Sequence, residues 1–292
     1  MQRHGPSSTL AVGASTLTLG CARRYSRVVS LRIGLALGGG AALGLAHIGV
    51  LKVLSEEGIG VDCIAGTSAG SVVGAAYCAG RSWREILDAA RRLEWSHLVS
   101  LTIPRQGMMR MDKLERYVEA TTGSRDISGL RIPFAAVATD LERGEPVVFK
   151  TGSVAKAVRA SCSVPGLFEP LRVGNAALVD GGLVNDVPAD VARELGADIV
   201  VAVNLHSRRL LSGPPKNILD IAYYTFDILL TNATQKGMSE ADLVVCPDLQ
   251  GFHYRNLKRV DDLVARGESA MRESVPELRR LIDARLRRRS NA

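Results

Sequence analysis

Short apolar runs alternate with longer segments of helical periodicity along most of this chain, and this alternation limits its fold more than any other feature. The runs have the length of buried strands, and the segments between them repeat apolar residues at the spacing of a helix. Strands that alternate with helices are typical of a sheet whose faces are covered by helices. The sequence therefore predicts an α/β protein.

The expected elements cover the chain from residue 31 onward. Strands are predicted at Leu31–Leu37, Val61–Ala65, Phe134–Thr139, Pro146–Phe149, Ala177–Val179, Ile199–Asn204 and Leu243–Cys246. Helices are predicted at Gly44–Glu57, Ser68–Ala79, Trp83–Leu93, Lys113–Thr121, Ser153–Ala160, Pro188–Leu195, Ile218–Glu240 and Asp261–Arg288. Residues 104–111 and 250–258 are predicted loops. The first helix is apolar nearly all round, so we expect it to be central, with His47 packed in the core.

The net charge of +7 is concentrated at the two ends of the chain. Residues 1–30 contain four arginines and no acid, and residues 279–292 contain six arginines and one acid, so the remainder is slightly negative. Such a body lacks the basic face that binds nucleic acid phosphates. We therefore expect no nucleic acid partner, and basic ends that contact an anionic membrane surface or improve solubility.

Residues 1–30 are interpreted as a leader that precedes one domain over residues 31–292. The leader contains Arg3, a mildly apolar run from Leu10 to Gly20, and then Cys21, which loosely resembles a bacterial lipoprotein signal. A disordered leader is the other interpretation. The expected location is the cytoplasm or the membrane periphery, with anchoring through Cys21 as the alternative.

A serine lies between two glycines at the junction of a predicted strand and a predicted helix. The segment runs Gly66, Thr67, Ser68, Ala69, Gly70. A nucleophile elbow needs small residues two positions before and two after its serine, because the turn is tight. Negative charge that develops at the serine would also meet the positive end of the helix. The pattern indicates a nucleophile, although a serine before a helix is also a common N-cap.

A glycine-rich segment follows the first predicted strand. It contains Gly38, Gly39, Gly40, Ala41 and, at the start of the helix, Gly44. Consecutive glycines let several main-chain N–H groups point into one concavity, which suits either an oxyanion or a phosphate.

A dinucleotide site is one interpretation of the same glycines. It would use Gly38, Gly40 and Gly44, with Asp62 binding the ribose. The spacing departs from the strict fingerprint by one residue.

A carboxylate stands at the end of a third predicted strand. Asp180 is followed by Gly181 and Gly182, so its side chain can be presented at a pocket without crowding from its neighbours. The same three residues would also suit an ordinary turn.

Together these segments resemble the patatin-like phospholipase family. The resemblance spans about Arg32 to Asn204 and follows the family's order. It includes LALGGGAA at 35–42, AHIGVL at 46–51, GTSAG at 66–70, ATDL at 138–141, ASCSVPGLF at 160–168 and VDGGLVN at 179–185. The similarity extends to bacterial members and to the catalytic domain of neuropathy target esterase.

The resemblance implies a three-layer α/β/α sandwich with a mainly parallel central sheet and hydrolysis of acyl esters of lipids. Ser68 would be the nucleophile and Asp180 its base, with the amides of Gly39, Gly40 and Ala41 as the oxyanion hole. Neither a cofactor nor a metal ion is expected. The oligomeric state, the acyl chain and the head group are not indicated.

One residue departs from the family pattern. Members usually carry Arg or Lys just before the last glycine of the glycine-rich motif, where this chain has Leu43. Loss of a cation beside an oxyanion loop is expected to weaken transition-state stabilisation or change head-group preference, because one such group contributes roughly 3 kcal/mol.

Three alternatives remain open. A conventional triad would add His206, which ends an apolar strand, to Ser68 and Asp180. A nicotinamide-dependent oxidoreductase would use the glycine-rich segment. A catalytically silent lipid-binding protein is suggested by Leu43 and by the arginine-rich last helix, which is otherwise predicted to be an amphipathic cover for the sheet.

Overall fold

One mixed sheet forms the centre of the molecule. The structure, a computed structural model, describes residues 31–103, 106–123, 126–206 and 214–290. The strands of this sheet are β1 (Ile33–Leu37), β2 (Cys63–Thr67), β5 (Phe134–Asp140), β6 (Glu145–Phe149), β7 (Leu171–Val173), β8 (Ala176–Asp180), β9 (Ile199–Val203) and β10 (Leu243–Val245). They are ordered β10-β9-β1-β2-β5-β8-β7, and β6 also pairs with β5.

The pairing confirms a mainly parallel sheet at its centre. Strands β10, β9, β1, β2 and β5 are joined by parallel pairing, whereas β6, β7 and β8 add antiparallel pairs at one side. A two-stranded hairpin of β3 (Ser100–Leu101) and β4 (Met109–Arg110) lies outside this sheet. Because β1 and β2 are parallel neighbours, the segments that follow them leave the same edge of the sheet.

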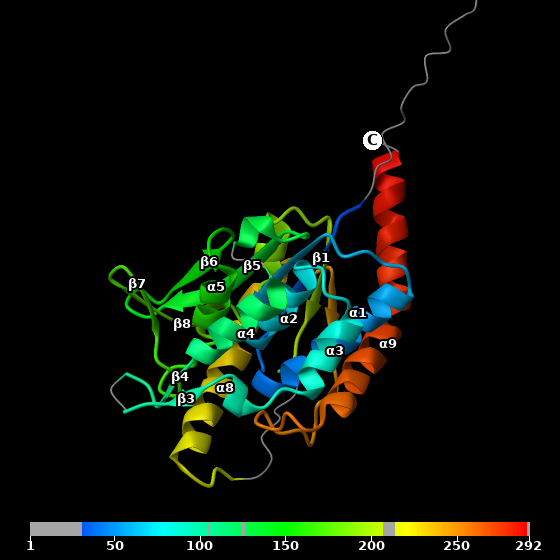
Figure 1. Cartoon of the computed structure of the whole chain (residues 1–292). Coiled ribbons are helices and arrows are strands. Elements are labelled where there is room, and N and C mark those ends of the chain that lie inside the picture. The colour runs from blue at the N-terminus through cyan, green and yellow to red at the C-terminus, as the bar shows by residue number, and fades with distance from the viewer. Residues whose placement is uncertain (1–30, 104–105, 124–125, 207–213, 291–292) are drawn as a thin grey trace, which may run out of the picture. The chain divides into compact units, whose positions relative to one another are not determined.

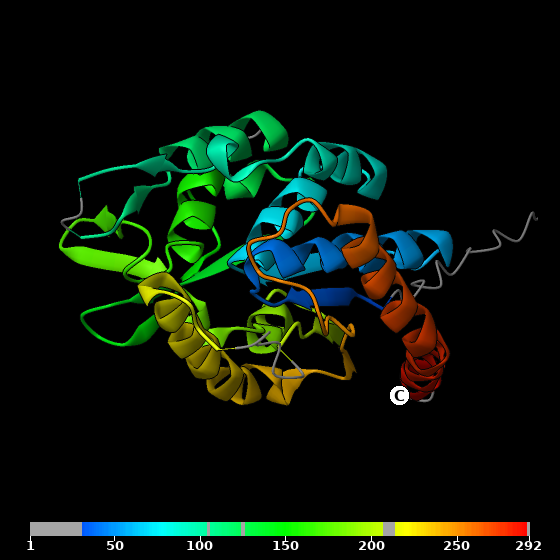
Figure 2. The same cartoon turned by 90° about the horizontal axis from the view of Figure 1, so that it is seen from below.

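Helices cover both faces of the sheet (Figures 1 and 2). Their bounds are α1 (Ala46–Glu56), α2 (Ala69–Cys78), α3 (Trp83–Arg91), α4 (Asp112–Thr122), α5 (Val154–Ser161), α6 (Gly182–Asn185), α7 (Ala189–Glu194), α8 (Ile218–Gly237) and α9 (Val260–Ser290), with 3₁₀ turns at Ala41–Leu45 (η1), Trp95–His97 (η2), Ile127–Gly129 (η3) and Met238–Glu240 (η4). In Figure 2 the yellow α8 lies on one side of β1, and the blue α1 and cyan α3 lie on the other. The three-layer α/β/α sandwich is confirmed.

The strands carry different side chains on their two faces. Leu35 and Leu37 of β1 and Ile64 of β2 pack in the core beneath α1, α2 and α9. The alternate positions, Ala36 and Cys63 among them, pack against α7. Successive side chains of a strand point to opposite faces, so continuous apolar runs are what a sheet buried on both faces requires.

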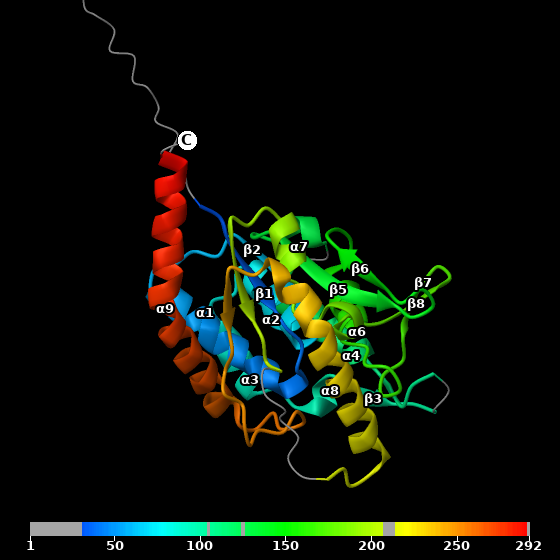
Figure 3. The same cartoon turned by 180° about the vertical axis from the view of Figure 1, so that it is seen from behind.

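The last helix is the predicted cover, and it packs along α1 (Figure 3). Leu263, Met271 and Leu278 of α9 are fully buried, whereas its arginines face solvent. Helix α1 is buried over most of its length, as expected for a central helix. None of the described helices combines the length and the apolarity needed to cross a bilayer.

The predicted elements match the structure best where the periodic pattern is long. Strands β3, β4 and β7 and the short helix α6 were not predicted, because elements of two to four residues carry too little periodicity to recognise. Residues 109–110 of one predicted loop form β4, and residues 250–258 are a loop as predicted. The predicted leader, residues 1–30 with Cys21, lies outside the described residues.

Candidate active site

Ser68 occupies a strained turn between β2 and α2. Its backbone has φ 50° and ψ −123°, and Ser68 and Ala41 are the non-glycine residues with positive φ in the described part of the chain. Such strain is concentrated at functional sites. The turn is held by the Ser68 N–H, which donates to Ser161 Oγ at 2.8 Å, while the Ser161 hydroxyl donates to the Val137 carbonyl at 2.6 Å.

The glycines around Ser68 have no space for a side chain. A Cβ atom on Gly66 would lie 2.7 Å from the main chain of Gly70 and Ser71, and one on Gly70 would overlap the Leu37 carbonyl. The first turn of α2 therefore packs directly against the ends of β2 and β1. This close approach is the physical reason for small residues two positions either side of Ser68.

Asp180 is the last residue of β8 and is almost completely buried. Its Oδ1 accepts the Gly182 N–H at 2.9 Å, whereas its Oδ2 has no hydrogen-bond partner in the described part of the chain. Burial raises the pKa of Asp180 to about 7, and the Gly182 N–H and the Ser68 hydroxyl act in the opposite direction. The structure thus brings Ser68 and Asp180 together across more than a hundred residues of sequence.

The two glycines after Asp180 begin α6 beneath α8. A Cβ atom on Gly181 would overlap the Val137 carbonyl, and one on Gly182 would overlap the Leu230 side chain. Only glycine fits between the strand end and these neighbours. The turn therefore holds the Asp180 carboxyl group in place through the hydrogen bond from the Gly182 N–H.

The glycine-rich segment forms a turn next to Ser68. A Cβ atom on Gly39 would lie 3.3 Å from the Ser68 Cβ. The Gly39 N–H donates to Asp186 Oδ1 at 3.1 Å, while the N–H groups of Gly40 and Ala41 have no hydrogen-bond partner among residues 31–103, 106–123, 126–206 and 214–290. Of the three predicted oxyanion donors, the N–H groups of Gly40 and Ala41 are thus available to a ligand, whereas that of Gly39 is already hydrogen-bonded to Asp186.

The backbone on either side of these donors is firmly held. The Gly38 N–H donates to the Val203 carbonyl at 3.1 Å, and the Ala42 N–H donates to the Tyr254 carbonyl at 3.0 Å. Gly44 lies within the 3₁₀ turn η1, against Ala69 at the start of α2. The turn is therefore preorganised, which is what stabilisation of a developing charge requires.

His47 supports the same turn from the core. It is fully buried, its Nε2 lies 2.8 Å from the Gly38 carbonyl oxygen, and burial lowers its pKa to about 4. The neutral ring therefore donates from Nε2 to Gly38. This is the packed, hydrogen-bonded role that the sequence predicts.

Leu43 points into the core rather than toward the site. Its side chain is 2% exposed and belongs to the main hydrophobic cluster. An arginine in this conformation would bury an unpaired charge, which costs several kcal/mol. Leu43 therefore contributes to packing beneath the glycine-rich turn.

A second group of buried polar side chains lies behind the glycine-rich turn. Asp186 Oδ1 accepts the Gly39 N–H, and its Oδ2 lies 3.8 Å from His206 Nε2. The Thr234 hydroxyl lies 3.3 Å from the same Oδ2 and 2.7 Å from the Leu230 carbonyl oxygen, between which it shares its proton. The other ring nitrogen, Nδ1, lies 3.0 Å from Asp227 Oδ1. Burial opposes protonation of His206, but Asp186 and Asp227 together raise its pKa.

Sequence reasoning missed Asp186 and Asp227. Asp227 and Thr234 lie on the same face of α8, about two turns apart, and nothing in the sequence places that helix against the turn after β8. Neither ring nitrogen of His206 has Ser68 or Asp180 as a hydrogen-bond partner. The structure places His206 with this second group instead of completing a Ser68–His206–Asp180 triad.

The dinucleotide interpretation fails on geometry. Asp62 precedes β2, and its carboxylate accepts the Ile33 N–H at 2.7 Å, at the start of β1. The glycine-rich turn follows the other end of β1. A ribose-binding acid must lie at the same edge of the sheet as the glycines, namely where the parallel strands end. Asp62 lies at the opposite edge, where they begin, so it cannot serve in that role.

An apolar pocket opens beside Ser68, and we call it the Ser68 pocket. Its volume is about 120 Å³. It is lined by Ala41, Ala42, Gly44, Leu45, Ser68, Ala69, Val72, Val73, Leu93, Trp95, Leu98, Met111, Leu114, Cys162, Val164, Phe168 and Leu257. A second apolar pocket of about 230 Å³, the Met109 pocket, shares Ala41, Trp95, Val164 and Phe168 with it. The two together suit an aliphatic chain.

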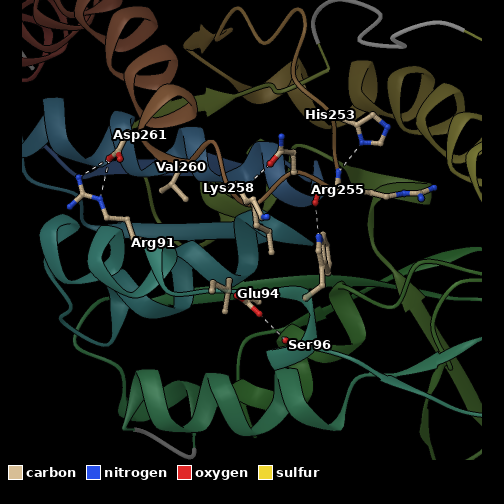
Figure 4. Close-up of a pocket in the computed structure, with 12 residues that line it drawn as sticks. Arg91, Glu94, Ser96, His253, Arg255, Lys258, Val260 and Asp261 are labelled. Atoms are coloured by element: carbon tan, nitrogen blue, oxygen red, sulfur yellow. Dashed lines mark hydrogen bonds and ion pairs between the residues drawn. The ribbon is translucent and has the colours of Figure 1, made fainter.

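A polar groove adjoins the Ser68 pocket on another side (Figure 4). Its volume is about 890 Å³, and it shares Leu93, Trp95 and Leu257 with that pocket. Arg91 is paired with Asp261 across it, and the Trp95 indole donates to the Arg255 carbonyl at 2.7 Å. Among the described residues, no group of His, Cys, Asp or Glu side chains is arranged to hold a metal ion.

Comparison with known proteins identifies the family. The patatin-like phospholipase family model matches residues 35–193, more than half of the chain. The chain belongs to the patatin-like phospholipase family. This confirms the resemblance that the sequence motifs indicate.

Individual relatives of this patatin-like chain cover it to different extents. It is 31% identical over 277 residues to an uncharacterized NTE family protein of Mycobacterium bovis, with 85% of this chain and 47% of the relative covered. It is 38% identical over 197 residues to mouse patatin-like phospholipase domain-containing protein 6, with 63% of this chain and 14% of the relative covered. The chain thus spans about half or less of the length of these curated relatives.

A solved structure has the same fold. VipD from Legionella pneumophila matches with a TM-score of 0.51 and 15% identity, covering 87% of this chain and 67% of that one. At this identity the likeness concerns the fold alone.

Proposed function

We propose that this chain is a serine acyl hydrolase that cleaves ester bonds of phospholipids or lysophospholipids with Ser68 as nucleophile and Asp180 as base. The observation that carries the proposal is the strained Ser68 beside a buried carboxyl group with one unbonded oxygen and a pKa of about 7. A base with a pKa near the working pH combines a large ionised fraction with enough basicity to accept a proton.

The proposed reaction uses these groups in two steps. Ser68 Oγ attacks the ester carbonyl as its proton passes to Asp180 Oδ2, and the alcohol then leaves with that proton. Water next attacks the acyl-enzyme, Asp180 accepts a proton from it, and the carboxylic acid leaves as Ser68 regains its hydroxyl. Negative charge on the carbonyl oxygen is stabilised by the N–H groups of Gly40 and Ala41 and by the positive N-terminal end of α2.

The pockets support a lipid substrate. The Ser68 pocket is lined almost entirely by apolar side chains, so an acyl chain would bury apolar surface next to the nucleophile. The polar groove, with Arg91, Arg255 and Lys258, lies beyond the same tryptophan and suits a head group. An anionic membrane surface is accordingly the proposed setting of the reaction.

The test is a hydrolysis panel of phospholipids, lysophospholipids and short soluble esters with wild type, Ser68→Ala and Asp180→Asn. Labelling by a fluorophosphonate ester should occur in wild type and disappear in Ser68→Ala. His206→Gln should keep activity within about tenfold of wild type, whereas a triad histidine would lose nearly all activity. A folded wild-type chain that neither labels nor hydrolyses any ester would overturn the proposal in favour of a silent lipid-binding protein.

A further inference from the structure

Large apolar side chains are strongly exposed on two segments of this molecule. In the β3–β4 hairpin, Leu101 is 87% exposed and Ile103 is 76% exposed. In the first turn of α8, Ile218 is 73% exposed and Ile221 is 50% exposed. Single exposed apolar residues are ordinary, but clusters of them mark interaction surfaces.

Both segments border the Met109 pocket. Leu101 pairs with Met109 across the hairpin, and Met109 lines that pocket. Asp220 of α8 forms an ion pair with Arg255 at 2.5 Å, and Arg255 lines the same pocket. Figures 1 and 3 show the hairpin and the first turn of α8 at the same end of the molecule, remote from the end of α9.

We propose that Leu101, Ile103, Ile218 and Ile221 form a docking surface that inserts into an anionic lipid bilayer, with the Met109 pocket facing the membrane. This inference rests on the proposed function, since it supplies the route by which a lipid reaches Ser68. The Met109 pocket shares four lining residues with the Ser68 pocket, so an acyl chain that leaves the bilayer stays in contact with apolar surface.

The charges around this surface favour an anionic partner. Lys216, two residues before Ile218, and Lys258, on the adjoining loop, are exposed, and neither has an ion-pair partner among the described residues. The nearby acid Asp220 is buried and already paired with Arg255. Each unpaired lysine near an anionic bilayer strengthens binding to it.

The basic end of α9 is a weaker candidate for the same role. Arg285 is paired with Asp242 at 3.1 Å, and Arg289 is paired with Asp198. These pairs neutralise part of the charge on the helix. In addition, the end of α9 does not border either apolar pocket. A membrane bound there would leave the route to Ser68 open to water.

The test compares three proteins in binding to vesicles. The docking variant carries Leu101→Glu and Ile221→Glu. The control variant carries Val244→Glu and Leu286→Glu, which replace apolar side chains that are 40% and 39% exposed on β10 and α9. The two variants change the net charge equally, and none of the four residues lines the Ser68 pocket, the Met109 pocket or the polar groove. Sedimentation with vesicles of phosphatidylcholine and phosphatidylglycerol in equal parts gives binding, and hydrolysis of a soluble short-chain ester reports the active site.

The docking variant should lose vesicle binding by about tenfold or more, while the control variant binds as wild type does and both hydrolyse the soluble ester normally. Equal binding by wild type and the docking variant would overturn the proposal, as would greater loss in the control variant. If the docking variant changes only from dimer to monomer, the surface belongs to a second copy of this chain, and the proposal is wrong. If vesicle binding depends on the docking surface but no ester is hydrolysed, the proposed function is wrong and the docking surface is still supported.

Discussion

The end of β8 and the turn that follows it each bury a carboxylate, yet they equip those groups differently. Asp180 has one oxygen bonded to the Gly182 N–H and one oxygen with no hydrogen-bond partner among the described residues, and the Ser68 hydroxyl lowers its pKa. Asp186 accepts the Gly39 N–H through Oδ1, and its Oδ2 lies 3.3 Å from the Thr234 hydroxyl and 3.8 Å from His206 Nε2. Burial raises the pKa of both, but only Asp180 keeps a free site for a proton in transit.

The contrast separates reactivity from positioning. A base must exchange a proton with substrate, so it needs an oxygen that no protein donor occupies. A positioning carboxylate acts through the groups it holds, so its oxygens face protein donors. In the proposed mechanism Asp180 therefore takes part in the chemistry, whereas Asp186 holds the Gly39 amide.

The largest expected effect comes from Asp180→Asn. The amide is nearly the same size and can still accept the Gly182 N–H, but it cannot accept the serine proton. We expect kcat to fall by about 10³-fold or more, with KM little changed. Steady-state kinetics on a soluble ester measure this effect, and Asp186→Asn is the matched control, which should keep most of the activity. An equal loss in both variants would remove the distinction between the two carboxylates.

A smaller loss is expected from Asp186→Ala. Without the acceptor for its N–H, Gly39 is free to turn, and the amides of Gly40 and Ala41 lose their orientation. We expect kcat to fall by about 10- to 100-fold with KM nearly constant, because the oxyanion forms only during reaction. Asp186→Asn keeps an oxygen at this place and should restore most of kcat. Activity of Asp186→Ala within about twofold of wild type would show that the Gly39 bond does not matter.

Replacing each buried carboxyl group by an amide should change stability by different amounts at the two sites. The pKa of Asp180 is raised from 3.8 to about 7 on folding, so the folded state is favoured below pH 3.8 and this advantage is lost as the pH rises to about 7. The full difference corresponds to about 4 kcal/mol, which is an upper bound. We expect Asp180→Asn to raise the free energy of unfolding by about 2 kcal/mol at pH 8, with a smaller gain at pH 5.5.

Urea denaturation of wild type and Asp180→Asn at the two pH values measures this gain. Asp186→Asn is the comparison, and it should gain less stability, because the Gly39 N–H and His206 offset part of the burial that raises the pKa of Asp186. A gain in Asp186→Asn as large as that in Asp180→Asn would contradict the assignment of these contacts.

The sequence predicts one of these carboxylates and not the other, for a physical reason. Strand ends of a parallel sheet converge on one edge, so motifs at 38–44 and 66–70 can be placed near each other from the strand pattern alone. Asp180 joins them only through the family resemblance, because β8 pairs with β5 in the antiparallel direction. Asp186 acquires its role from contacts with α8, forty or so residues later, and tertiary packing of that kind has no local periodicity. The burial of Leu43 could not be predicted from the sequence for the same reason, because it follows from packing beneath the glycine-rich turn.

The smallest expected effect is a displacement of the pH profile, and it probes how the two carboxylates act on each other. Because the base must be ionised, kcat/KM of wild type should rise with pH through about 7 and level off above it. The negative charge of Asp186 raises the pKa of Asp180, and the positive charge of His206 lowers it. Asp186→Asn should therefore move the rise to lower pH and His206→Gln should move it to higher pH, each by less than about one unit. Profiles that move in the same direction, or a wild-type rate that is flat between pH 5 and 8, would mean that Asp180 is not the group whose ionisation limits the rate.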